Sequence, residues 1–175
     1  DGVRLSDLKG YERQKRAIVD NTLALLSGRP AANVLLYGDA GTGKSSTVKA
    51  LVNEYADRGL RLVEVGKAQA GEIPAVLDEL RANPLKFILF LDDLSFAQEN
   101  DDFYTLKAVL EGSAATRAGN VVIYATSNRR HLIKERFSER EGDEVHRNET
   151  IQELTALSAR FGLTLGYFKP NRREY

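Results

Sequence analysis

Eight consecutive residues of this chain have the types and the spacing of a phosphate-binding loop. They run from Gly38 to Ser45 and read GDAGTGKS, which fits the pattern G-x-x-x-x-G-K-[ST]. Glycines let the backbone turn so tightly that successive N–H groups can point inward at a phosphate chain. The ammonium group of Lys44 can then reach the β- and γ-phosphates, and the hydroxyl of Ser45 can bind Mg²⁺. This run therefore predicts a site for a nucleoside triphosphate and magnesium.

The residues on either side of the loop support that prediction. Residues 33–37 read as a buried strand that runs into the loop, and residues 46–57 carry apolar side chains at helical spacing. A strand, a glycine loop and a helix are the arrangement that the motif requires. The candidate nucleotide-binding residues of this segment are Gly38, Asp39, Ala40, Gly41, Thr42, Gly43, Lys44, Ser45 and Ser46.

Two aspartates, Asp92 and Asp93, follow the most hydrophobic predicted strand, Phe87–Leu91. Ligands of open α/β sheets bind at the carboxyl ends of the strands, so Asp92 is expected beside the phosphate loop. It suits the role of holding Mg²⁺, usually through a water molecule. An aspartate at a strand end can instead cap a helix or accept a hydrogen bond from a loop. The phosphate-loop motif favours the metal-linked interpretation.

The second acid, Asp93, lies where many P-loop ATPases have the general base that polarises the attacking water. Such a base must come within hydrogen-bond reach of that water. Aspartate is one methylene shorter than the glutamate commonly found there, so hydrolysis is expected to be slow. The alternative, that Asp93 is not the base, stays open.

Two further residues distinguish among P-loop classes. Asn128 follows the predicted strand Val121–Ala125, and its amide can bond both the γ-phosphate and the attacking water. Taken alone, Ser-Asn after a strand is an ordinary turn signal. Arg160 follows a predicted helix, and it can act as an arginine finger on the nucleotide of a neighbouring subunit. Taken alone, it can equally interact with the C-terminal dipole of that helix.

The order of predicted elements indicates how these residues are positioned. Strands and helices alternate along the chain, which favours an α/β layered fold with a parallel sheet. A densely charged stretch at residues 134–149 is expected to be a solvated loop, and a basic cluster at residues 129–131 receives no functional assignment. Besides the segments already given, we expect helices at residues 11–26, 73–80, 103–110 and 150–157, and strands at residues 60–65 and 163–168.

Composition limits the class of protein. The 175 residues are enough for one domain with a core, and 25 basic residues balance 25 acidic ones. This balance gives no overall electrostatic preference for nucleic acid or an anionic membrane. There is no cysteine, and the two histidines lie far apart in sequence, which disfavours a zinc site. No apolar run has the length that a membrane span needs.

Four motifs in this order resemble those of the AAA+ ATPases, and specifically a bacterial branch known as domain of unknown function 815. They are the phosphate loop, LDDLSF from Leu91, IYATSNRRHL from Ile123 and LSARFGL from Leu157. The resemblance extends from Leu8 to Phe168, nearly the whole chain. DDLSF together with SNRRHL is distinctive, whereas the phosphate loop alone is not.

The resemblance implies a three-layer P-loop NTPase fold with five parallel strands, in which the Asn128 strand lies between those of Lys44 and Asp92. Lys44 and Ser45 would belong to Walker A and Asp92 and Asp93 to Walker B, with Asn128 as sensor 1 and Arg160 as the finger acting in trans. The cofactors would be ATP and Mg²⁺. Tyr11 falls where AAA+ proteins contact adenine, although a core aromatic at a helix start is an equal alternative. AAA+ proteins commonly form rings or spirals, so a homo-oligomer is expected when nucleotide is bound.

We take residues 1–175 as one AAA+ nucleotide-binding domain, with an N-terminal loop and helix at residues 1–30. The chain begins at Asp1 and contains no methionine, so we expect a piece of a longer, cytoplasmic protein whose C-terminal helical lid is missing here. The leading hypothesis is an ATPase that moves or remodels an unidentified macromolecular client, without a membrane. The alternatives are a nucleotide-dependent switch with little hydrolysis and, more distantly, a small-molecule kinase.

Overall fold

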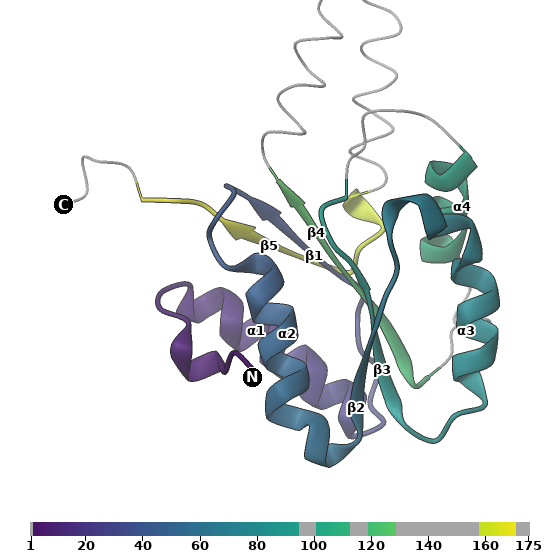
Figure 1. Ribbon diagram of the computed structural model, residues 1–175, viewed down its shortest axis with the longest axis horizontal. Coiled ribbons are helices and arrows are strands. Elements are labelled where there is room, and N and C mark those ends of the chain that lie inside the picture. Colours follow the sequence, from purple (N-terminus) through teal and green to yellow (C-terminus); the bar gives the residue numbers. More distant parts are fainter. Residues whose placement is uncertain (1, 95–100, 113–118, 129–157, 171–175) are drawn as a thin grey trace, which may run out of the picture.

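The computed structural model describes residues 2–94, 101–112, 119–128 and 158–170 (Figure 1). The helix predicted at residues 150–157, the charged loop at residues 134–149 and the basic cluster at residues 129–131 lie outside these ranges. Within them the chain forms one α/β unit, in which a central sheet has helices on both faces (Figure 1). The α/β fold class predicted from the sequence is confirmed.

Five parallel strands form the sheet in the order β2-β3-β4-β1-β5. β4, which ends at Asn128, therefore lies between β1, which leads into the phosphate loop, and β3, which leads to Asp92. This is the order that the family resemblance implies. It brings three strand ends with polar side chains to one edge of the sheet. The bounds are β1 Val34–Gly38, β2 Leu60–Glu64, β3 Lys86–Leu91, β4 Val121–Asn128 and β5 Leu163–Tyr167.

Apolar side chains on both faces of the central strands hold the layers together. Alternate residues of β3 point to opposite faces, so Leu89 packs in one hydrophobic cluster and Phe90 in the other. The first cluster lies under α3 (Ile73–Arg81) and α4 (Asp101–Glu111), and the second under α1 (Glu12–Leu26) and α2 (Lys44–Tyr55) (Figure 1). Burial on both faces explains why residues 87–91 of β3 are all apolar. Three 3-10 turns complete the described elements, at Leu5–Asp7, Ala56–Arg58 and Lys67–Glu72.

The end of β4 differs from the sequence prediction. The strand continues through Thr126, Ser127 and Asn128 instead of ending at Ala125, and Asn128 pairs with Gly38 of β1. Thr126 and Ser127 are almost fully buried, with 2% and 1% of their surface exposed. Both hydroxyl groups have hydrogen-bond partners inside the fold. Ser127 Oγ donates to the carbonyl of Leu94 at 2.9 Å, and Thr126 Oγ1 donates to Asp92 Oδ1 at 2.8 Å. Short polar residues that usually indicate a turn are therefore compatible with a buried strand here.

Other element ends differ by a few residues. α2 begins at Lys44 and ends at Tyr55, whereas the sequence indicates residues 46–57. α1 begins at Glu12, because Tyr11 has a left-handed backbone (φ 54°) and serves as the N-cap. β5 ends at Tyr167, one residue earlier than expected. In the described part of the chain, no helix combines the length and the apolar character that crossing a bilayer requires.

Candidate functional site

The phosphate loop begins at Gly38, where only glycine fits. Its φ is 134°, and a Cβ at this position would lie 2.2 Å from the carbonyl oxygen of Tyr167 on β5. The approach is this close because the next residue, Asp39, donates its backbone N–H to the same oxygen at 2.8 Å. A side chain at Gly38 would therefore separate the loop from β5.

The loop ends at the N-terminus of α2. Gly41 and Gly43 both have a positive φ, 73° and 90°, and Gly43 is the N-cap of the helix. The first N–H groups of a helix have no partner within the helix, and the helix dipole adds positive potential there. Thr47 stabilises this end, since its hydroxyl donates to the carbonyl of Gly43 at 2.7 Å. The arrangement is a cradle of N–H groups for an anion.

Lys44 is buried in this cradle, with 5% of its surface exposed. Its Nζ donates to the carbonyl of Asp39 at 2.5 Å and to Thr42 Oγ1 at 3.4 Å. Burial lowers the pKa of the ammonium group below 10.5, although the nearby carboxylates of Asp39, Asp93 and Asp92 oppose this effect, and Lys169 adds to the lowering. The group is a partly desolvated cation held at the loop by neutral oxygen atoms.

Asp92 accepts two hydrogen bonds at the end of β3. Ser45 Oγ donates to its Oδ1 at 2.5 Å, and Thr126 Oγ1 donates to the same atom at 2.8 Å. Thr126 Oγ1 in turn accepts the backbone N–H of Asp93 at 2.8 Å. Thr126 is a site residue that sequence reasoning missed, because a threonine within an apparent turn gives no signal that its hydroxyl orients a carboxylate.

Asp93 and Asn128 are in direct contact. Asn128 Nδ2 donates to Asp93 Oδ1 at 3.1 Å, and Asp93 has a left-handed backbone with a φ of 57°. This conformation is uncommon for a residue other than glycine and costs roughly 1 kcal/mol. The surrounding hydrogen bonds therefore hold the second acid in one orientation.

These groups converge on one cavity of about 290 Å³ between the loop and the strand ends. Most of the predicted site residues line it, so residues from three separate parts of the sequence share one surface. Its lining consists of Ala40, Gly41, Thr42, Gly43, Lys44, Ser45, Ser46, Asp92, Asp93, Thr126 and Asn128.

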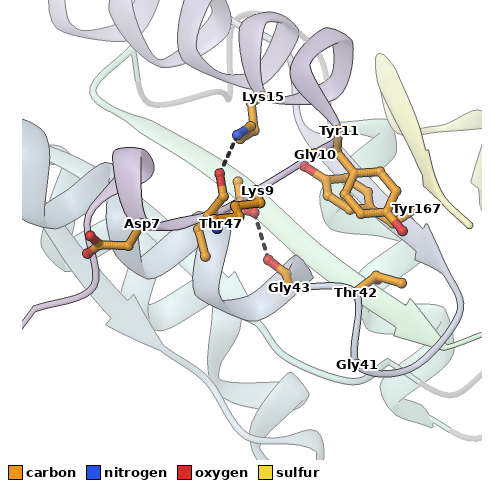
Figure 2. A pocket seen from close by; sticks show the side chains of 11 residues that line it. Asp7, Lys9, Gly10, Tyr11, Lys15, Gly41, Thr42, Gly43, Thr47 and Tyr167 are labelled. Carbon is orange, nitrogen blue, oxygen red and sulfur yellow. Dashed lines mark hydrogen bonds between the residues drawn. The ribbon is translucent and has the colours of Figure 1, made fainter. Parts of the chain in front are cut away.

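A second cavity, of about 280 Å³, lies on the other side of the loop and shares Gly41, Thr42 and Gly43 with the first. Tyr11 and Tyr167 stack there with their ring centroids 4.7 Å apart, next to the loop (Figure 2). The Tyr11 hydroxyl donates to the carbonyl of Phe168 at 2.9 Å. An aromatic wall beside a phosphate cradle is a suitable surface for a nucleobase. Tyr11 thus lines the cavity and also packs in the core.

Tyr167 was not recognised from the sequence. Its side chain is 1% exposed, and within the described residues its hydroxyl makes no hydrogen bond. An aromatic residue at the end of a predicted strand reads as a core residue, which gives no indication that it lines a cavity. Burial raises the pKa of its phenol above 10.0, and burial and Asp39 do the same for Tyr11. Both rings are therefore neutral at ordinary pH.

The structure does not bring Arg160 to this site. Arg160 precedes β5, whose first residue, Leu163, pairs with Val34 at the start of β1, whereas the loop follows the end of β1. Its Nη2 forms an ion pair at 2.7 Å with Glu111, the last residue of α4. The Arg160 side chain is 44% exposed. Among the described residues, it lines neither of the two cavities.

Comparisons with known proteins place this geometry in context. The sequence model of a family described as "Protein of unknown function (DUF815)" matches residues 1–175. A search of curated proteins found no match.

Solved structures with a similar fold include three proteins of low sequence identity. The RuvB Holliday junction branch migration motor of Thermotoga maritima is 17% identical with a TM-score of 0.53, and the match covers 94% of this chain and 47% of that one. PCH-2 of C. elegans is 19% identical with a TM-score of 0.60, and the match covers 97% of this chain and 46% of that one. ORC1 of Aeropyrum pernix, solved in complex with DNA, is 12% identical with a TM-score of 0.58. That match covers 93% of this chain and 46% of the other. The chain spans about half the length of each.

Proposed function

This chain belongs to the family described as "Protein of unknown function (DUF815)" and has the fold of the AAA+ P-loop ATPases, and from that premise we propose that it binds ATP with Mg²⁺ and hydrolyses it. Residues 1–175 form its nucleotide-binding domain. The nucleotide cycle drives movement or remodelling of a macromolecular client in the cytoplasm. The single observation that carries the proposal is the convergence of Lys44, Asp92, Asp93 and Asn128 on one cavity beside the glycine loop.

The residues present fit a phosphate chain and a magnesium ion. The cradle supplies backbone N–H groups and the Lys44 ammonium for phosphate oxygens. Ser45 and Asp92 supply one hydroxyl and one carboxylate, the hard oxygen donors that Mg²⁺ takes while it keeps several of its water ligands. Bound there, the ion would neutralise charge that develops on the phosphates. The Ser45–Asp92 hydrogen bond marks where both residues would turn toward the metal.

Asp93 and Asn128 are the groups proposed to act on the attacking water. Asp93 would accept a proton from this water as its oxygen bonds to the γ-phosphorus and the bond to the β–γ bridging oxygen breaks. Asn128, which already donates to Asp93 at 3.1 Å, would orient both partners. The products are ADP, inorganic phosphate and a proton that leaves to solvent.

Tyr11 and the second cavity are proposed to receive the nucleoside. The shared glycines of the loop mean that a ligand can extend from one cavity to the other across Gly41. The stack of Tyr11 on Tyr167 offers an aromatic face beside that path. The alternative role of Tyr11 as a core aromatic is compatible with the same contact.

Arg160 is proposed to act on the nucleotide of an adjacent subunit in a homo-oligomer. Its separation from the cavities of its own chain and its exposure support this role, and Glu111 holds its guanidinium by charge. Two of the similar structures are of a branch migration motor and of a protein bound to DNA. We propose a macromolecular client for this chain without assigning it to nucleic acid or protein.

Phosphate release at steady state tests the proposal. The full-length protein should turn over ATP in a Mg²⁺-dependent manner, and Lys44→Ala should abolish both turnover and nucleotide binding. Lys49→Ala is the matched control, because Lys49 is an exposed lysine on the same helix. Turnover that survives Lys44→Ala unchanged, or no turnover at any protein concentration, contradicts the enzymatic assignment.

A nucleotide-dependent switch is the second candidate, and the geometry of Asp93 favours it. The short side chain is already bonded to Asn128 and is held at a φ of 57°, so reorientation toward water has a cost. A switch binds ATP tightly and changes its oligomeric state with ATP, and Asp93→Asn should leave both properties unchanged.

A further inference from the structure

The segment that follows β5 is tied to the phosphate loop by two hydrogen bonds. Asp39, the second residue of the loop, donates its N–H to the carbonyl of Tyr167 at 2.8 Å. The carboxylate of Asp39 accepts the backbone N–H of Lys169 at 2.8 Å. Because β5 lies beside β1 at the edge of the sheet, the chain that leaves it continues next to the loop (Figure 1). The backbone of residues 167–169 is thus held in a fixed relation to the loop.

This fixed backbone places a second ammonium group at the loop. Lys169 Nζ lies 3.9 Å from the position that a Cβ on Gly41 would occupy. Gly41 lines both cavities, so the group lies beside the part of the loop that the two cavities share. Lys169 is also close enough to Lys44 to disfavour its charged form.

The Lys169 ammonium is available to a ligand. The residue is exposed, and in the described part of the chain no carboxylate forms an ion pair with it. Asp39 receives its backbone N–H, so the bond that fixes the segment does not use the side chain. A lysine carries a compact charge on a flexible stem, which can follow a phosphate group over a few ångströms.

Several carboxylates lie near the loop, and a second cation there would offset part of their negative charge. Three carboxylates, those of Asp39, Asp92 and Asp93, act on Lys44. A polyphosphate at the loop would therefore lie near these carboxylates as well as near the ammonium group of Lys44. Mg²⁺ would offset the carboxylate of Asp92, but Asp39 lies at the other end of the loop, next to Lys169. A cation at Lys169 offsets that charge where the polyphosphate passes.

We propose that Lys169 is a second phosphate-binding residue, which contacts the polyphosphate of the bound nucleotide where it crosses Gly41. This assignment rests on the proposed nucleotide binding and deepens it, because it adds a contact from the segment after β5 to those of the loop. The contact between Lys169 and the nucleotide should stabilise binding more as the number of phosphates increases. It should stabilise binding less at high ionic strength, since an exposed charge is screened by salt.

Titration calorimetry of the full-length protein with ATP, ADP and AMP, each with Mg²⁺, tests the assignment. Lys169→Ala should weaken ATP binding by about 5- to 20-fold, ADP binding less and AMP binding by about twofold at most, as expected for one partly screened charge pair. Lys169→Arg should retain most of the affinity for ATP. The control is Lys86→Ala at the first residue of β3, at the opposite end of the strands from the loop, which should bind like the wild type.

Ionic strength and thermal stability separate a charge contact from a structural role. Raising the salt concentration from about 0.05 M to about 0.5 M should reduce the difference in ATP affinity between wild type and Lys169→Ala, because the Debye length falls severalfold. The midpoint of thermal unfolding without nucleotide should match the wild type, since the backbone bonds of residue 169 remain. If Lys169→Ala lost equal affinity for ATP, ADP and AMP and also had a lower midpoint of thermal unfolding, the assignment would be overturned in favour of a structural role.

Two outcomes distinguish this assignment from the proposed function. If the wild type binds ATP and Lys44→Ala does not, while Lys169→Ala binds like the wild type, then Lys169 is a solvated surface charge and only this inference fails. If the wild type binds none of the three nucleotides, both the proposed function and the role of Lys169 are wrong.

Discussion

Ser45 Oγ donates a 2.5 Å hydrogen bond to Oδ1 of Asp92, and this contact joins the first turn of α2 to the end of β3. The two residues are 47 positions apart in the sequence. Each is a hard oxygen donor. Together they mark where Mg²⁺ would bind in the cavity between the loop and the strand ends. The hydroxyl thus holds the carboxylate in one position.

Replacing Ser45 with alanine should affect the binding of ATP only when Mg²⁺ is present. The variant loses one oxygen ligand and leaves Asp92 with Thr126 as its remaining hydroxyl partner, so the Kd for ATP with Mg²⁺ should rise about tenfold or more. Calorimetry with Mg²⁺ and with a chelator measures the difference. Ser127→Ala is the control, because that hydroxyl bonds to Leu94 and not to Asp92. An equal loss with and without Mg²⁺ would contradict the metal role.

Asp93→Asn should separate binding from hydrolysis. The amide keeps the size of the side chain and can still contact Asn128, but it cannot take a proton from water. Turnover should fall by about 100-fold or more, while the Kd for ATP changes by less than about threefold. Single-turnover phosphate release measures the first quantity and calorimetry the second. Unchanged turnover favours the switch, and faster turnover in Asp93→Glu would locate the limitation in the reach of the shorter acid.

Mixing two inactive variants tests whether Arg160 acts in trans. Lys44→Ala retains Arg160 but should not bind nucleotide, whereas Arg160→Ala should bind nucleotide but lack the finger. Each alone should lose turnover, by about 1,000-fold for a finger of ordinary strength. A mixture should recover part of the rate, because mixed interfaces combine an intact site with an intact arginine. The absence of recovery in a mixture that forms mixed oligomers would contradict action between subunits.

The fold was predictable from sequence because its signals are local and repeated. A strand that is apolar throughout, such as Phe87–Leu91, has to lie in the middle of a sheet with helices on both faces. The phosphate loop fixes a strand before it and a helix after it, and the acids at the end of Phe87–Leu91 then fall at the same edge of the parallel sheet. These relations depend on residue type at short spacing, which a sequence displays directly.

The parts that the sequence did not predict depend on contacts between distant segments. Asn128 belongs to β4 because the hydroxyls of Thr126 and Ser127 bond to Asp92 and Leu94 in the segment after β3, and turn propensity does not contain that information. Tyr167 and Lys169 reach the site only because β5 pairs with β1. No spacing rule connects residue 39 with residue 169.

Gly38→Ala should destabilise the fold more than an ordinary glycine substitution. The new Cβ would meet the Tyr167 carbonyl at 2.2 Å, and the backbone has a φ of 134°, so both sterics and conformation oppose it. We expect a loss of about 3 kcal/mol or more in the free energy of unfolding. Gly28→Ala is the control, since its φ is 73° with no atom within 4 Å of the added Cβ, and it should cost about 1 kcal/mol. Urea denaturation measures both, and equal losses would contradict the close approach.

The lowered pKa of Lys44 predicts that stability and ATP affinity change in opposite directions as the pH rises. Between the pKa of folded Lys44 and 10.5, the unfolded chain binds more protons than the folded one, so this residue's contribution to stability increases with pH. In the same window folded Lys44 loses the charge that is proposed to contact phosphate, so the Kd for ATP should rise. Tyr11 and Tyr167, whose pKa values lie above 10.0, stay protonated through most of this range.

Two substitutions at Lys44 isolate these effects as the pH is raised toward 10.5. Lys44→Met removes the titrating group, so its free energy of unfolding relative to the wild type should become less favourable as the pH rises. Lys44→Arg keeps a permanent charge, so its ATP affinity, although weaker, should stay constant across the window. Urea denaturation measures the first quantity and calorimetry the second. A constant stability difference between wild type and Lys44→Met would mean that burial does not disfavour the charged lysine, and the cradle would then be open to water in solution.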